Sequence, residues 1–168
     1  MSRRNFILIF LAIDFVAVLI WALVVMFNGP RGSILKKMDK LADIVSMEEF
    51  KPLDAIKDSQ TFLTYFTDPV LIETNYAEFN TNHDTESLKT LFLQGWHSSN
   101  SIKLTFRNKL ADIQDNENLT VTTDALLIAN PKQAAQETYE QTLVFHWKKA
   151  GGKWRIHKIV SNEVSDEF

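Results

Sequence analysis

Two hydrophobic patterns divide this sequence. Residues 5–27 are apolar at nearly every position, whereas the rest of the chain alternates apolar and polar residues with the periods of helices and strands. A helix over residues 5–27, at about 1.5 Å per residue, reaches on the order of 30 Å, enough to cross the core of a bilayer. The run is apolar on every side, which disfavours a buried core helix. The sequence predicts a transmembrane helix over 5–27 after a short basic tail, residues 1–4.

A cleaved signal peptide is the alternative for this stretch. Such a peptide has an apolar core of roughly 7–15 residues and a small-residue cleavage site. Here the run continues to Phe27 and is followed by Asn28, Gly29 and Pro30, which favours an uncleaved single-pass anchor. Basic residues flank both ends, so they give no clear orientation. The very short basic tail favours a membrane protein whose folded domain lies outside the cytoplasm, in a periplasmic location.

Asp14 is an ionisable residue within the apolar run. A carboxyl at that depth costs a few kcal/mol and usually faces a partner or a water path. One interpretation is a contact with another membrane helix. The other is that Asp14 is protonated or reaches toward the nearer interface. The expected partners are the lipid bilayer and other membrane proteins or a second copy of the chain.

The remaining residues form one predicted domain, 34–168, after a linker at 28–33 that contains two glycines and a proline. Apolar positions predict a helix from residue 34 to about 46, and Thr85 can cap a second helix from Glu86 to about Trp96. Residues 80–84 are polar and predict a loop. Strict alternation then predicts strands, with a hairpin at Gly151-Gly152; these strands cover residues 101–107, 119–128, 137–149 and 153–164. Helices followed by a long antiparallel meander indicate an α+β fold.

Three segments resemble the nuclear transport factor 2-like superfamily, also called cystatin-like α+β rolls. They are the helix-to-strand entry at 62–71, the helix at 86–96, and the closing hairpin at 143–156 with its Lys-Trp-Arg-Ile run. The resemblance implies a bent antiparallel sheet that wraps around helices and leaves a conical pocket. The layout, with a transmembrane helix before the roll, is similar to the bitopic assembly component of type IV secretion systems.

Enzymes on this fold would need pocket groups that move protons, such as an Asp or His base with a Tyr donor. The residues that could line a pocket are Tyr65, Asp68, Trp96, His146 and Trp154. Four of these five residues have a plainer interpretation: Asp68 precedes Pro69 in a turn, the histidine alternates with a tryptophan on a strand, and the tryptophans suit a core. The sequence has no metal-ligand spacing, no phosphate loop and no nucleophile elbow. We therefore assign no catalytic, cofactor-binding or metal-binding residue and expect no cofactor.

Charge and composition narrow the function further. The net charge is −3 and no dense basic run is present, which argues against a nucleic-acid partner. The chain has no cysteine, so disulfides and thiolate sites are excluded. The sequence predicts a membrane-tethered interaction or assembly module. The alternative is an isomerase-like or dehydratase-like enzyme, or a small-ligand binder, that uses the pocket of the roll. The interior separates the two: an enzyme needs converging ionisable groups, whereas a scaffold needs a pocket closed by apolar side chains.

Overall fold

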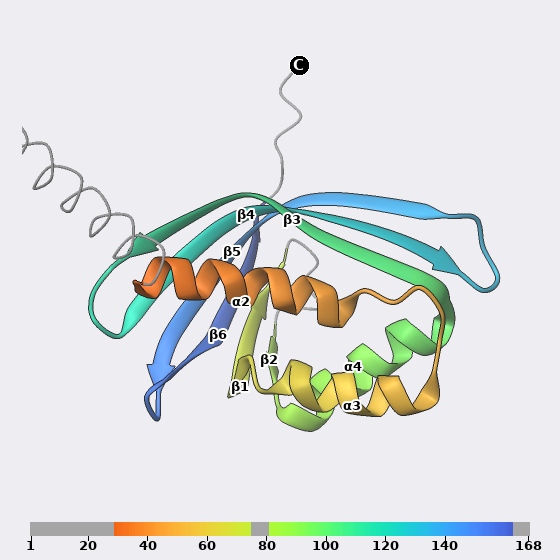
Figure 1. The fold of residues 1–168 in the computed structure, drawn as a ribbon, viewed down its shortest axis with the longest axis horizontal. Coiled ribbons are helices and arrows are strands. Elements are labelled where there is room, and N and C mark those ends of the chain that lie inside the picture. The colour runs from red at the N-terminus through yellow and green to blue at the C-terminus, as the bar shows by residue number, and fades with distance from the viewer. Residues whose placement is uncertain (1–28, 75–80, 163–168) are drawn as a thin grey trace, which may run out of the picture. The chain divides into compact units, whose positions relative to one another are not determined.

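A computed structural model describes residues 29–74 and 81–162 (Figure 1). The chain forms two compact units, 1–36 and 37–168, and the second contains every described strand. The described elements, with the labels of Figure 1, are α2 (Pro30–Val45), α3 (Pro52–Leu63), β1 (Phe66–Glu73), β2 (Thr81–His83), α4 (Thr85–Ser98), β3 (Ser99–Ile113), β4 (Asn118–Pro131), β5 (Glu137–Ala150) and β6 (Lys153–Asn162).

One six-stranded sheet has the strand order β2-β1-β6-β5-β4-β3. Strands β3 to β6 form the predicted antiparallel meander, and β5 and β6 meet at the Gly151-Gly152 turn, where both glycines have positive φ. Strand β1, however, lies parallel to β6, with Ile72 opposite Ile159. The prediction of an antiparallel sheet was therefore wrong, and the sheet is mixed. A hairpin would force β1 to run antiparallel to its neighbour. Because β1 follows α3 and no hairpin joins it to β6, it can run parallel to β6.

The predicted fold class also included a transmembrane helix, and this part needs correction too. Within residues 29–74 and 81–162, no helix is both long enough and apolar enough to cross a membrane. The stretch 5–27 and Asp14 lie outside the described residues. The partner contact of Asp14 and the location outside the cytoplasm stay predictions.

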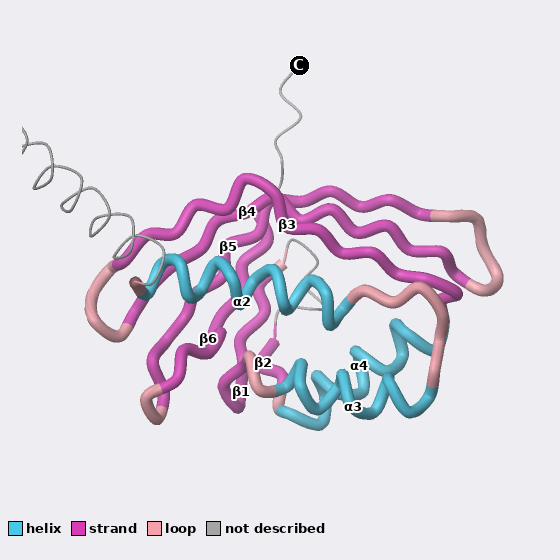
Figure 2. The backbone as a smooth tube through the Cα atoms, in the orientation of Figure 1, coloured by secondary structure: helices cyan, strands magenta, loops and turns pink. Residues whose placement is uncertain are grey.

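The second half of α2, together with α3 and α4, packs against one face of the sheet (Figure 2). Asp84 caps α4 by accepting a hydrogen bond from the Ser87 amide at 2.8 Å, so the cap precedes the predicted Thr85 by one residue. A row of aromatic rings fills the space between helices and sheet, with centroids 4.7–4.9 Å apart along Phe66, Phe62, Phe92 and Trp96. The opposite face of the sheet carries no described helix (Figure 1).

The segment after α2 covers part of the exposed edge of β3. Met47 and Ile102 exchange two backbone hydrogen bonds, of 2.8 and 2.9 Å. Beside them, the hydroxyl of Ser46 donates to the Ala42 carbonyl at 2.7 Å and accepts from the Leu104 amide at 3.0 Å. An edge strand whose backbone groups are paired in this way cannot readily add another strand at those residues.

We expect Ser46→Ala to lower the free energy of unfolding by about 1–2 kcal/mol, because it leaves the Leu104 amide without its acceptor. Ser98→Ala is the matched control, since the Ser98 hydroxyl donates to the Gly95 carbonyl and is exposed. That control should cost less than about 0.5 kcal/mol. Urea denaturation of both variants measures the difference, and equal costs would contradict the role of Ser46 at the edge of β3.

Candidate functional site

The interior of the roll is closed by apolar side chains. Trp96 is 3% exposed, and its indole N–H donates to the Val45 carbonyl at 2.9 Å, so its polar atom serves the packing of α2 against α4. Phe106 and Phe145 meet edge to face at 5.4 Å over the next part of the sheet. The residues packed between helices and sheet thus form a core rather than a conical pocket lined with ionisable groups.

Tyr65 lies half-buried at the end of α3, where its carbonyl accepts a hydrogen bond from the Ile156 amide at 2.7 Å. Burial raises the pKa of the Tyr65 phenol, and the negative charge of Asp43 raises it further. The phenol therefore stays protonated at neutral pH. A neutral phenol near one carboxylate can share a hydrogen bond with a ligand, but it does not form an acid–base pair with the other predicted residues.

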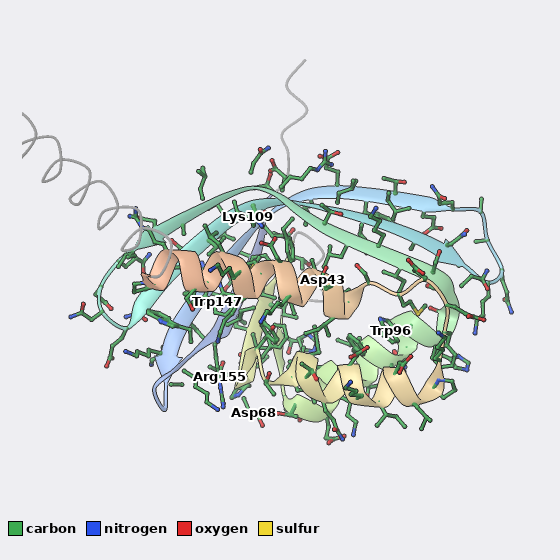
Figure 3. All side chains as sticks on the ribbon, viewed as in Figure 1. Asp43, Asp68, Trp96, Lys109, Trp147 and Arg155 are labelled. Atoms are coloured by element: carbon green, nitrogen blue, oxygen red, sulfur yellow. The ribbon has the colours of Figure 1, made fainter. Side chains whose placement is uncertain are left out.

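Asp68 lies on β1 (Figure 3), and Trp154 lies on β6. Asp68 is exposed and accepts a hydrogen bond from the Thr85 hydroxyl at 2.8 Å, which joins the turn of β1 to the start of α4. Trp154 is half-buried near the β5–β6 turn, and its carbonyl accepts from the ammonium of Lys37 at 3.0 Å. These contacts give both residues a structural role.

His146 lies on the face of the sheet opposite the helices, beside His157, with ring centroids 6.1 Å apart. Partial burial lowers the pKa of both imidazoles. Lys158 on β6 lowers both further, and Lys148 on β5 lowers that of His157, while Glu73 on β1 opposes the shift at His146 and pairs with Lys158 at 2.8 Å. Both imidazoles are therefore neutral at pH 7.

These two histidines make stability depend on pH. Their pKa values in the folded chain lie below the ordinary 6.5, so the unfolded chain binds more protons as the pH falls below about 6.5. We expect the free energy of unfolding to decrease over that window and to decrease less in His146→Gln/His157→Gln. Urea titrations at pH 7.5 and 5.0 test this. An equal pH dependence in both proteins would contradict the shifts, and His97→Gln is the control.

The same outer face carries a largely apolar row of three aliphatic side chains and one threonine that crosses four strands, which we call the apolar row. Leu110 of β3 lies opposite Thr122 of β4, Thr122 opposite Val144 of β5, and Val144 opposite Val160 of β6. Leu110 is 72% exposed and the other three are half-buried, although no described helix covers them. The alternation of each strand was visible in the sequence, but the register that aligns these residues was not. Sequence reasoning therefore missed this row.

A polar row lies next to it. Asp124 accepts hydrogen bonds from the Asn108 amide at 2.8 Å and from the Thr142 hydroxyl at 3.0 Å, and these bonds hold its pKa below its usual value. Arg107 and Glu140 form an ion pair of 3.0 Å alongside. These side chains satisfy one another, so the outer face presents ordered polar groups beside an open apolar row.

Two hollows border the segment between α2 and α3. The larger, about 700 Å³, lies between the second half of α2 and the edge of β3, and a smaller one of about 290 Å³ includes Trp96 in its lining. A third, shallow hollow of about 770 Å³ lies along α4 beside Phe50. Tyr65, Asp68, His146 and Trp154 line none of these three. In the described part of the chain, no group of three or more carboxylates and imidazoles could hold a metal ion.

Comparison with known proteins shows the fold. Neither a protein-family model nor a curated protein matches the sequence. Solved structures that are similar to the chain include the following three. The association domain of calcium/calmodulin-dependent protein kinase II from C. elegans is 14% identical, with 83% of this chain and 99% of that chain covered and a TM-score of 0.60. A scytalone dehydratase-like protein of Novosphingobium aromaticivorans is 12% identical, with 77% and 82% covered and a TM-score of 0.62.

The third similar structure is a protein of unknown function with a cystatin-like fold from Nostoc punctiforme. It is 11% identical, with 80% and 92% of the two chains covered and a TM-score of 0.55. The chain thus has the nuclear transport factor 2-like, or cystatin-like, fold, as its sequence predicts. Proteins with this fold include dehydratase-like enzymes and association domains, so the fold agrees with either an assembly domain or a ligand binder.

Proposed function

We propose that this domain is an association module that pairs with a second copy of the chain through the outer face of its sheet. The observation that carries the proposal is the row formed by Leu110, Thr122, Val144 and Val160, which stand side by side across β3, β4, β5 and β6. An apolar row on an uncovered sheet face gains free energy when another apolar surface excludes water from it.

The other boundaries of the sheet support this choice of surface. Ser46 and Met47 cover part of the edge at β3, and the helices pack against the inner face. Sheet-on-sheet packing places two such faces about 10 Å apart, with side chains interdigitating between them. The outer face is the part of the sheet where an equivalent row from a second copy can approach.

The enzyme interpretation has weaker support from the geometry. Proton transfer needs a base and a donor within hydrogen-bond reach of one substrate atom. The described interior brings Tyr65 near Asp43, while Asp68 is exposed elsewhere and His146 lies on the other side of the sheet. The similarity of the fold to that of the C. elegans kinase association domain supports association over catalysis.

Light scattering after size exclusion tests the proposal on the full chain. A particle with a whole-number multiple of the chain mass, shifting toward single chains on dilution, is the expected result. A single chain at all concentrations up to about 100 μM would contradict it.

A further inference from the structure

The groove between α2 and β3 has the form of a binding site for a short extended segment. Its floor is apolar: Ala42, Met47 and Phe106 are 7%, 7% and 8% exposed. It is bounded at one end by the backbone pairing of Met47 with Ile102 and at the other by the ion pair of Asp39 with Lys109. Six residues of β3 lie between Ile102 and Lys109, which corresponds to roughly 20 Å of extended chain.

The rim of the groove is negatively charged. Six carboxylates and two lysines border the groove and the smaller hollow that adjoins it at Ser46–Glu48; the carboxylates are Asp39, Asp43, Glu48, Glu49, Asp54 and Asp58. Of these six, Asp39 alone takes part in an ion pair within the described residues, with Lys109. Asp43 and Glu48 are exposed on opposite sides of Ser46 and Met47, so their charges face whatever enters.

From the apolar floor and this unneutralised rim, we infer that the groove binds an extended peptide segment of another protein in which apolar residues alternate with lysine or arginine. In an extended segment successive side chains point to opposite sides. Alternate residues therefore reach the floor formed by Ala42, Met47 and Phe106, while the cationic residues between them reach the carboxylates. A second copy of this chain, with its net charge of −3, is a poorer match in charge.

The proposal assigns opposite effects to two substitutions. Asp43→Asn/Glu48→Gln removes two rim charges and should weaken binding of a cationic segment. Lys109→Gln removes the cation that pairs with Asp39 at the end of the groove and should strengthen it. A gain in affinity cannot result from a damaged fold, so the second variant keeps the test decisive. Asp112→Asn/Glu117→Gln changes the net charge equally at exposed positions, one near the end of β3 and one in the β3–β4 turn, and serves as the matched control.

The experiment uses the full chain and three labelled six-residue peptides in which leucine alternates with lysine, serine or glutamate, with binding followed by fluorescence anisotropy. We expect the lysine peptide to bind at least tenfold more tightly than the other two. Asp43→Asn/Glu48→Gln should weaken it about tenfold, Lys109→Gln should strengthen it about threefold, and the control should change it less than twofold. Higher salt should weaken binding.

Three results would overturn the inference: equal binding of the serine peptide, equal loss in the control variant, or no gain in Lys109→Gln. The measurement is repeated in Val144→Glu, which is designed to stop pairing through the sheet and lies outside the groove lining. Unchanged peptide binding in that variant is expected. It would show that the groove acts independently of the outer face, whether or not the proposed pairing occurs.

Discussion

Val144→Glu is expected to dissociate the paired chains, with a dissociation constant at least about 100-fold higher than that of the unchanged chain. Val144 is central in the apolar row, with Thr122 on one side and Val160 on the other. Pairing would bury the new carboxylate near the equivalent carboxylate of the second copy. A buried charge without a partner of opposite charge is costly. Sedimentation velocity across a concentration series measures the effect.

Leu53→Glu is the matched control for this variant. Leu53 lies on α3 and is 82% exposed. Leu53→Glu therefore also replaces an aliphatic side chain with a carboxylate, but on a surface away from the sheet. Its sedimentation should equal that of the unchanged chain. Circular dichroism should show both variants folded. If Val144→Glu stays paired while folded, or if Leu53→Glu dissociates equally, the outer face is not the pairing surface.

Trp147→Ala is expected to lower the free energy of unfolding by about 3–5 kcal/mol, the largest stability effect that we expect from a single residue. Trp147 is 0% exposed and lies on β5 opposite Leu119 and Ile156, which are 1% and 0% exposed. Its indole N–H has no hydrogen-bond partner among the described residues, so the cost comes from lost packing rather than from a lost hydrogen bond. Urea denaturation followed by circular dichroism measures it.

Trp154→Ala provides the comparison, because Trp154 is half-buried at the end of the same hairpin. It should cost roughly 1–2 kcal/mol, in proportion to the apolar area that it buries. Equal costs for the two tryptophans would show that burial at Trp147 does not dominate the stability of the sheet.

Much of the sheet could be predicted from the sequence because alternation is a local signal. The strands over β3, β4, β5 and β6 and the Gly151-Gly152 hairpin follow directly from the positions of apolar residues and turn residues. Strand β2, at Thr81–His83, falls within the stretch predicted as a polar loop. Strand β2 joins the edge of the sheet through backbone pairing with β1. Backbone pairing does not require apolar side chains, so the sequence of β2 lacks the alternation that marks the other strands.

Helix starts and strand partners were harder to predict for a related reason. Pro30 begins α2 inside the predicted linker, because proline fits the first turn of a helix as well as it fits a break. The parallel pairing of β1 with β6 depends on contacts between distant segments, which no local pattern reports. The apolar row at Val144 and the groove at Met47 likewise arise from register and packing.

The distance between two spin labels across the proposed pair tests the central claim most directly. The chain has no cysteine, so Thr122→Cys introduces a single labelling site in the middle of the apolar row. Paired sheets lie about 10 Å apart, and the labels should therefore be within about 25 Å of each other in a pulsed electron paramagnetic resonance measurement. Labels at Ser98→Cys, on α4, should be farther apart. A long or absent distance at Thr122→Cys in chains that remain paired would contradict association through the outer face of the sheet.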